Sequence, residues 1–401
     1  MPNEGKSDRG IGGSQGITNR LRERRVAAGL SQGDLAAMTG ITRQALYAIE
    51  MNHYLPGTEV ALRLASNLGC AIEDLFSFES QDDIVEAEFI GGMAASRNAS
   101  RVKIASVGGR LVAKPVSDLG EVLNYTVSAD GIRLGRVSTR SVASHRPHRI
   151  YVQLLRPRQV IERQIVVAGC DPAIFLAGEH IRQHGGDATV LGWTMGSLAA
   201  LQALKRGEVH VAGIHVVDHR SGDFNLPFLR KYLKGHAVTV VRFAAWQEGL
   251  LLRRGNPKGV RGVEDLARSD VRIVNREQGA GARLLLDHVL AKTGIPHRVV
   301  RGYQTLCSSQ VGLGRVIVEG KADVGIGTQA VAELFGLDFF PLQEERYDLV
   351  IPTASLHSHP GMKTFLDTLV TRGFRRELEA LGGYDTKEIG KIIEYILPSS
   401  E

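Results

Sequence analysis

The sequence has little cysteine and no long apolar run. Its three cysteines, Cys70, Cys170 and Cys307, lie far apart, which fits neither a disulfide framework nor a zinc site. Such usage is typical of a reducing compartment, so we expect a cytoplasmic protein. Because no run of about 18 apolar residues occurs, no membrane span is expected. The segment 1–16 is rich in Gly, Ser and charge without an apolar stretch, and we expect a disordered tail rather than an export signal.

Basic residues exceed acidic residues, and the formal net charge is +6 at pH 7. Most of the excess lies in residues 97–163. A basic surface of this kind suits a polyanionic partner such as nucleic acid. The length of the chain predicts two or three domains, the largest with a substantial core.

The segment SQGDLAAMTGITRQALYAIEMN has the pattern of two short helices joined by a tight turn. Ser31 and Thr42 are suited to cap the two helices, and Gly40 permits the turn between them. Arg43 and Gln44 then lie at the exposed start of the second helix. These residue types form paired hydrogen bonds with guanine and adenine edges in the major groove of DNA.

The amphipathic segments before and after this pair complete a small helical bundle. Together they resemble the Xre family of helix-turn-helix domains, of the lambda-repressor and Cro type, over residues 17–78. The resemblance implies a homodimer on double-stranded operator DNA and a salt bridge between Arg25 and Glu50. It also implies a DNA-binding surface of six residues: Gln32, Thr42, Arg43, Gln44, Tyr47 and Asn52.

Residues 84–164 contain short strand-like pieces with turn signals at Gly108-Gly109 and Asp130-Gly131. We expect a short, β-rich, basic connector here. Its surface is either a second DNA-facing region or a solvated face of a linker domain. The expected strands are 101–107, 110–116, 123–129 and 149–155.

From residue 165 to residue 398, strand-like and helix-like segments alternate. This order predicts an α/β domain with largely parallel sheets and helices on both faces. Its length suits two lobes around a ligand cleft. The segment 298–303 is expected to be a strand, and a single helix is expected from Pro360 to Leu381.

Several loop-to-helix junctions in this region are candidates for ligand binding. Ser197 stands at one predicted helix start, and Gly279 and Gly281 open another helix directly after a strand. The first N–H groups of a helix lack internal partners and bind anions. Arg283 falls near the first turn, where the helix dipole disfavours a cation, which suggests a compensating bound anion.

The order of the motifs AGCDPA, GSLAALQALKRGEVHVAGIHVVD, NREQGAGARLLLD and GKADVGIG resembles the cytoplasmic relatives of periplasmic molybdate-binding proteins, over roughly 165–385. The resemblance implies a PBP-like ligand-sensing domain with a type II periplasmic-binding fold, over 165–398. Crossover strands are implied near 241–247 and 340–348. A small molecule or oxyanion effector would contact eight implied cleft residues: Asp171, Ser197, His215, Asn225, Arg276, Gly279, Arg283 and Tyr303.

Two departures from the family pattern favour a larger, less charged organic ligand over molybdate. Ala280 and Ala282 stand where hydroxyl side chains are usual, and Ser309-Gln310 replaces a Thr-His pair. A bare oxyanion needs many hydrogen-bond donors, and these changes remove several of them.

No metal site, cofactor or catalytic residue is expected. His215 and His219 could chelate a metal together on a helix, but their segment reads as the end of a strand. Cys170 has no general base that the sequence identifies, so its thiol is not assigned a catalytic role.

The sequence therefore predicts a multidomain protein: an all-α helix-turn-helix domain, a β-rich connector and a two-lobed α/β domain. We expect a ligand-responsive DNA-binding transcriptional regulator rather than an enzyme. The alternative is an enzyme or a ligand carrier on a type II binding fold, with an autoregulatory DNA-binding domain. An enzyme would show a nucleophile–base pair or a metal cluster in the cleft, and a carrier would bind ligand without changing DNA affinity.

Overall fold

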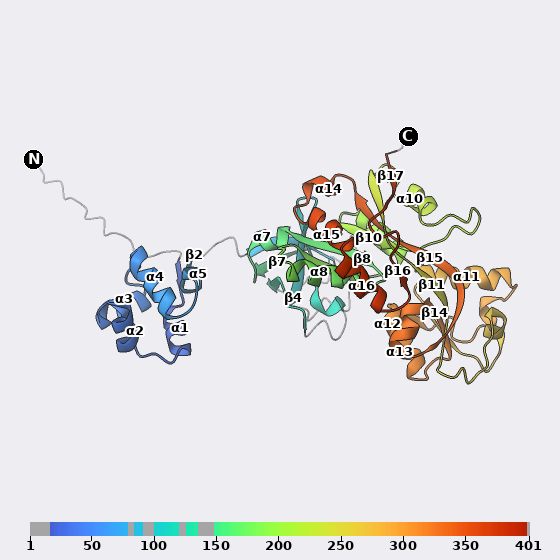
Figure 1. Ribbon diagram of the computed structural model, residues 1–401, viewed down its shortest axis with the longest axis horizontal. Coiled ribbons are helices and arrows are strands. Elements are labelled where there is room, and N and C mark those ends of the chain that lie inside the picture. The colour runs from blue at the N-terminus through green and yellow to red at the C-terminus, as the bar shows by residue number, and fades with distance from the viewer. Residues whose placement is uncertain (1–16, 79–83, 91–99, 120–125, 135–147, 399–401) are drawn as a thin grey trace, which may run out of the picture. The chain divides into compact units, whose positions relative to one another are not determined.

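The computed structural model describes residues 17–78, 84–90, 100–119, 126–134 and 148–398. They form two compact units, Met1–Ile84 and Val85–Glu401 (Figure 1). The predicted connector therefore falls in the same unit as the predicted ligand-sensing domain, and the tail predicted at 1–16 lies outside the described residues. Among the described residues, no helix is long and apolar enough to cross a bilayer.

The first unit is a helical bundle that a short two-stranded sheet closes. Ser31 and Asp34 form a capping box in which each side chain accepts a 3.1 Å hydrogen bond from the other's backbone N–H. Gly40 ends α2 with a φ of 76°, and Thr42 caps α3 through the amide of Ala45. Leu46 and Leu64 are fully buried in the core. The elements are β1 (Ile17–Asn19), α1 (Leu21–Ala27), α2 (Gln32–Thr39), α3 (Arg43–Glu50), α4 (Thr58–Asn67), α5 (Ile72–Leu75) and β2 (Phe76–Phe78).

The second unit begins with a closed barrel in the order β3-β5-β4-β6-β7. Three of the four predicted strands are present, but Thr126–Ala129 form no strand, and residues 123–125 lie outside the described residues. A buried 2.5 Å ion pair joins Lys103 to Asp130, which also accepts a 2.9 Å hydrogen bond from Gln164 on the neighbouring sheet. The barrel strands are β3 (Ile84–Phe89), β4 (Arg101–Val107), β5 (Arg110–Pro115), β6 (Gly131–Leu134) and β7 (His148–Leu154).

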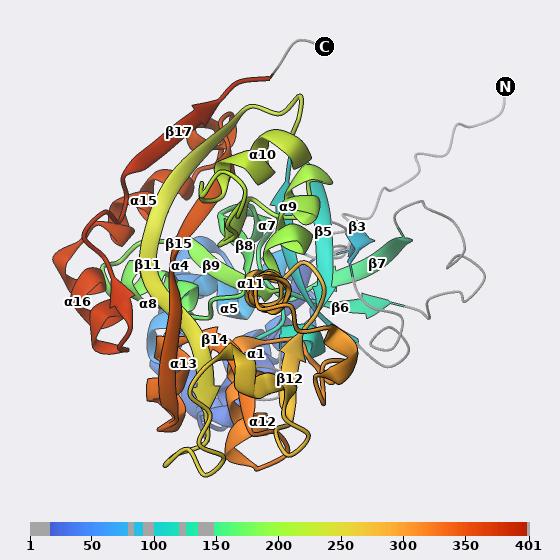
Figure 2. The ribbon, with the colours of Figure 1, turned by 90° about the vertical axis from the view of Figure 1, so that its right-hand side faces the viewer.

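A mixed sheet runs through the rest of the unit in the order β13-β12-β14-β11-β15-β10-β8-β9. The two 15-residue strands β11 (Val238–Leu252) and β15 (Asp338–Pro352) pair antiparallel and run side by side through both lobes (Figure 2). The β11 strand also pairs with β14 through Glu248–Leu252, and β15 pairs with β10 through Asp348–Val350. The segments predicted as crossovers lie within these two strands.

Two lobes result, each with parallel strands and helices. Lobe 1 contains β8 (Gln164–Gly169), α8 (Ile174–Gln183), β9 (Thr189–Thr194), α9 (Ser197–Lys205), β10 (Val211–Ile214), α10 (Leu226–Tyr232), α14 (Ser355–Ser358), α15 (Met362–Leu369), α16 (Arg372–Ala380) and β17 (Ile392–Ile396). Lobe 2 contains β12 (Ile273–Arg276), α11 (Gly281–Lys292), β13 (Leu306–Cys307), α12 (Gln310–Val318), β14 (Val324–Thr328) and α13 (Gln329–Phe335). The remaining short elements are α7 (Arg158–Glu162), which follows the barrel, β16 (Tyr384–Asp385), which pairs with β11, and the 3-10 helices η2 (Val116–Leu119), η4 (Val263–Ala267) and η5 (His297–Val299).

Two secondary-structure predictions about the lobes were wrong. The segment 298–303 is a short 3-10 helix and a turn, because Val300 and Tyr303 are buried three residues apart and not in strand alternation. The single helix predicted up to Leu381 is two helices, α15 and α16. The chain breaks at Thr371, whose hydroxyl caps α16 by accepting a hydrogen bond from the Phe374 amide.

Candidate functional sites

One face of α3 presents polar side chains to solvent while its other face is buried. Arg43 and Gln44 are exposed at the start of the helix, and Tyr47 follows one turn later with 49% of its surface exposed. Leu46 and Ile49 are buried in the bundle, so the polar face has a fixed direction. An exposed helix start with these residue types fits the major groove of DNA.

Glu50, at the end of α3, forms hydrogen bonds with side chains of both α1 and α2. Its carboxylate accepts hydrogen bonds from Arg25 Nε at 2.6 Å and from Gln32 Nε2 at 2.8 Å. Burial opposes the charge of Glu50, but these hydrogen bonds outweigh burial and lower its pKa. The salt bridge between Arg25 and Glu50 that the resemblance implied is present. The hydrogen bond from Gln32 to the same carboxylate holds the Gln32 side chain in one direction. Nearby, Asn52 has a φ of 58° and accepts a 2.9 Å hydrogen bond from Asn19.

The six residues predicted to contact DNA share one region of the bundle. Gln32, Arg43 and Tyr47 line a single hollow on the surface. Thr42 lies next to it as the cap of α3, Gln44 is exposed on the first turn, and Asn52 follows the helix. The structure thus brings the set together, and their DNA contacts remain a prediction.

In the second unit, the two lobes touch directly where α9 and α11 begin. Leu198 N donates a 3.2 Å hydrogen bond to the carbonyl of Gly279, which links lobe 1 to lobe 2. Ser197 Oγ accepts a 3.2 Å hydrogen bond from the backbone of His215. A methyl group added at Gly281 would lie 2.3 Å from the carbonyl oxygen of His215. Ser197, His215 and Gly279, three of the predicted cleft residues, therefore meet in a tight contact between the lobes.

Arg283 has a partner within its own helix. Its Nε lies 3.0 Å from both carboxylate oxygens of Asp287, and its Nη2 donates to Tyr303 Oη at 2.7 Å. Tyr303 Oη in turn donates to Asp287 at 2.6 Å. Asp287 thus supplies a negative charge beside Arg283, and a bound anion at this helix start stays a prediction. Arg276 is also paired, through 2.9 Å hydrogen bonds to Glu277.

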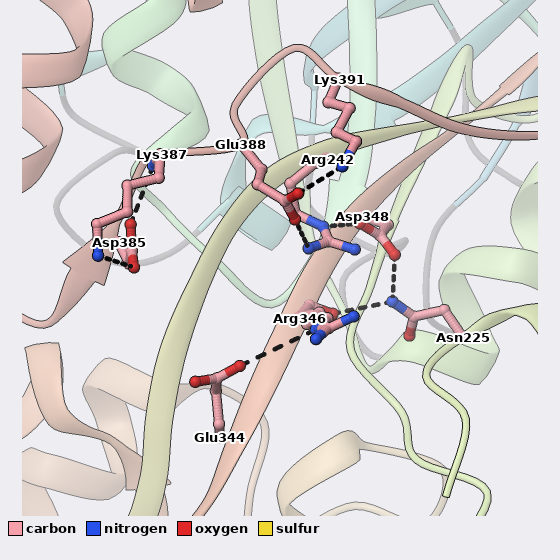
Figure 3. Close-up of polar contacts among 9 residues, drawn as sticks. All are labelled: Asn225, Arg242, Glu344, Arg346, Asp348, Asp385, Lys387, Glu388 and Lys391. Atoms are coloured by element: carbon pink, nitrogen blue, oxygen red, sulfur yellow. Dashed lines mark hydrogen bonds and ion pairs between the residues drawn. The ribbon is translucent and has the colours of Figure 1, made fainter. Parts of the chain in front are cut away.

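Asn225 lies in a buried polar network beside the crossover strands (Figure 3). Its Nδ2 donates to Asp348 at 2.7 Å and to the carbonyl of Arg346 at 2.9 Å. Asp348 also pairs with Arg242, which reaches Glu388 at 3.1 Å. Since every one of these contacts is made within lobe 1 and the crossover strands, Asn225 positions β15 in this structure.

A pocket of about 490 Å³ lies between the lobes, on a side that the predicted cleft residues mostly do not reach. Of the eight, only Asp171 lines it. One oxygen of Asp171 accepts 2.9 Å hydrogen bonds from Ala173 N and Tyr384 Oη, whereas Oδ2 has no hydrogen-bond partner among the described residues. Burial raises the pKa of this carboxyl. The lining is Cys170, Asp171, Pro172, Ala173, Leu176, Trp246, Gln310, Val311, Thr328, Ala330, Val331, Glu333, Leu334, Leu381 and Tyr384.

Behind Cys170, a buried polar cluster lies next to this pocket. Cys170 Sγ is 3.1 Å from Nε2 of His215, whose Nδ1 hydrogen-bonds to Glu345 and lies 3.1 Å from Glu248. His215 is therefore a basic partner of the thiol that the sequence did not identify. Burial opposes the charge of His215, but the neighbouring Cys170 and the two carboxylates raise its pKa well above 6.5. Burial and then the charge of Glu248 raise the pKa of Glu345 to about 8.

Sequence reasoning did not find the two carboxylates of this cluster. Glu248 and Glu345 lie in the crossover strands, and only pairing between residues about 100 positions apart brings them to His215. One signal was available: Glu248 interrupts the apolar run FAAWQEGLLL, where an acid needs a buried partner.

In comparisons with known proteins, two family models match separate parts of the chain. Residues 21–75 match the family model of a helix-turn-helix, and residues 178–370 match that of a PBP superfamily domain. YvgK of Bacillus subtilis (strain 168), described as uncharacterized, is 31% identical over 243 residues, which cover 59% of this chain and 78% of YvgK. An HTH-type transcriptional regulator of Methanocaldococcus jannaschii is 38% identical over 66 residues, 16% of this chain and 100% of that protein.

Among solved structures, an ABC-type phosphate transport receptor from Vibrio cholerae has a TM-score of 0.37 and 14% identity, covering 55% of this chain and 98% of that chain. A similarity at this TM-score supports no conclusion by itself. The fold and the family models define a helix-turn-helix domain joined to a two-lobed, periplasmic-binding-protein-like domain. The chain belongs to the family of YvgK.

Proposed function

We propose that the chain is a DNA-binding transcriptional regulator whose two-lobed domain senses a small molecule. The observation that carries the proposal is the exposed start of α3, where Arg43 and Gln44 face solvent from a helix whose opposite face is buried. Paired domains of a homodimer would read two half-sites of an operator. Ligand bound between the lobes would act by its difference in affinity for closed and open states.

The pocket supports an organic effector with an apolar body and at least one hydrogen-bond donor. None of its lining residues is a lysine, arginine or histidine, so a bare oxyanion finds no cation there. Apolar side chains such as Leu176 and Leu334 cover much of the lining. Asp171 Oδ2 is buried without a hydrogen-bond partner among the described residues, and a donor on the ligand would satisfy it.

The test measures binding of the full-length protein to a DNA sequence that it selects from a random pool. Arg43→Ala and Gln44→Ala should each weaken specific binding by about 1–3 kcal/mol and relax base preference at one position. Arg24→Ala is the matched control, because Arg24 pairs with Asp74 of α5, away from α3. Selection of no sequence, or unchanged affinity in both α3 variants, would contradict the proposal.

The effector role is tested separately with a panel of small organic molecules and oxyanions. A ligand at 100 times its dissociation constant should add about 2.7 kcal/mol of stability. The same ligand should shift affinity for the selected DNA, and Asp171→Asn should weaken ligand binding without changing DNA binding in its absence. A ligand that stabilises the protein but leaves DNA affinity unchanged would indicate a carrier instead.

One observation favours a second function, thiol chemistry in the pocket. Cys170, His215 and Glu345 stand in the order nucleophile, base and carboxylate, with Cys170 on the pocket wall. Cys170 is only 3% exposed, which restricts the access of a substrate. Alkylation by iodoacetamide distinguishes the two functions: an activated thiol reacts faster than Cys70, and the reaction slows in His215→Gln.

A further inference from the structure

Three buried side chains from separate segments converge next to the interlobe pocket. His215 follows β10, Glu248 lies on β11 and Glu345 lies on β15. Their ligating atoms all lie within 4.8 Å of one another, and each residue is at most 1% exposed. Both carboxylates are carried by paired strands, so the backbone holds them close together.

A single imidazole faces the two carboxylates of this cluster. Within the part of the chain that the structure describes, neither Glu248 nor Glu345 forms an ion pair with lysine or arginine. Their ion-pair partner is His215, and Glu345 also accepts a 2.8 Å hydrogen bond from Gln343 Nε2. Two carboxylates buried side by side repel each other, and a single imidazolium can neutralise only one of them. A divalent cation held by a neutral imidazole and two carboxylates would balance the charge.

Gln310, at the start of α12, supplies a second and independent observation. It is 3% exposed, and its amide faces the cluster with Nε2 3.4 Å from Glu248 Oε1. Its Oε1 has no hydrogen-bond partner among the described residues. A half-turn of the amide exchanges these two atoms and would present a neutral oxygen ligand to the cluster.

Cys170 stands on the other side of the imidazole ring. Its Sγ lies 3.1 Å from His215 Nε2, the ring nitrogen opposite the one that meets the carboxylates. With a metal ion bound, a hydrogen bond from Nε2–H to the sulfur would fix the tautomer in which the Nδ1 lone pair binds the ion in place of the present hydrogen bond to Glu345. Partners of this kind orient metal-binding histidines in proteins.

We propose that His215, Glu248 and Glu345 bind one divalent transition-metal cation, with Gln310 as a neutral fourth ligand. One imidazole nitrogen with carboxylate oxygens suits Zn²⁺ and its neighbours better than Ca²⁺, which takes six or more oxygen ligands. The ion joins both crossover strands to lobe 1 and, through Gln310, to lobe 2. The proposal stands whatever the regulator's effector and DNA sequence are.

The experiment titrates chelator-treated, full-length protein with Co²⁺, whose visible absorption reports on its ligands. We expect a band that saturates at one Co²⁺ per chain and disappears when Zn²⁺ is added. Glu248→Gln and Glu345→Gln keep the side-chain shape and should each lower the affinity at least about tenfold. His219→Gln is the matched control, because His219 stacks on His288 outside the cluster.

The proposal is overturned if no band forms, if the band persists at unchanged affinity in both glutamine variants, or if it is lost in His219→Gln. X-ray absorption of the unaltered protein loaded with Zn²⁺ covers the case in which the variants do not fold. Nitrogen and oxygen ligands are the expected result, and a sulfur ligand would place the metal elsewhere.

Discussion

His210 makes the stability of the second unit depend on pH. Its Nδ1 accepts a 3.0 Å hydrogen bond from the amide of Val166 on β8, and its Nε2 donates at 2.8 Å to the carbonyl of Ser106 on barrel strand β4. Only the neutral ring makes both hydrogen bonds, because protonation would turn Nδ1 into a second donor facing an N–H. The imidazole therefore makes both contacts, one to the barrel and one to lobe 1, only while it is uncharged.

The size of this pH effect on stability follows from the pKa shift of the imidazole. Burial, and then the nearby His359, lower the pKa of His210 from 6.5 to about 4. At a pH between 4 and 6.5, His210 takes up a proton in the unfolded chain but not in the folded chain. The stabilisation is therefore complete above pH 6.5 and is lost as the pH falls towards 4, by about 3 kcal/mol in total and about 2 kcal/mol by pH 5.

Urea unfolding followed by tryptophan fluorescence tests this, because both tryptophans, Trp193 and Trp246, lie in the second unit. Between pH 7 and pH 5, His210→Gln should lose about 2 kcal/mol less stability than the unaltered protein. The control is His357→Gln, because His357 is exposed on α14. This variant should lose as much stability as the unaltered protein. An equal loss in His210→Gln and the unaltered protein would refute the reasoning.

Two further predictions concern the lobe contact and the helical bundle. Gly281→Ala should destabilise the closed arrangement by about 1–3 kcal/mol and increase the radius of gyration measured by small-angle scattering, because the new methyl meets the His215 backbone. Gly373→Ala, where the nearest atom is 3.5 Å away, should do neither, and equal radii in the two variants would contradict the prediction. Glu50→Gln leaves the nearly buried Arg25 unpaired and should cost about 3 kcal/mol. Hydrogen exchange over 21–75 measures this cost, and unchanged protection would show that the pair contributes nothing.

The helix-turn-helix could be predicted because its determinants are local. Ser31, Gly40 and Thr42 act on the residues beside them, and the apolar spacing of α3 fixes which face is buried. The two-lobed fold was also predictable, since the alternation of strands and helices and the order of motifs extend over the whole segment. The errors at 298–303 and in the last helix arose where a short apolar pattern suits more than one structure.

The sequence by itself determined most of the helices and strands and which residues face the outside of α3. The family resemblance added Asp171 and His215 as candidate cleft residues, of which Asp171 lines the pocket between the lobes. Only the tertiary structure decided that Tyr303 contacts Arg283 and Asp287, and that Glu248 and Glu345 meet His215. The physical reason is range: caps, turns and periodicity act over a few residues, whereas the pairing of β11 with β15 joins positions about 100 residues apart.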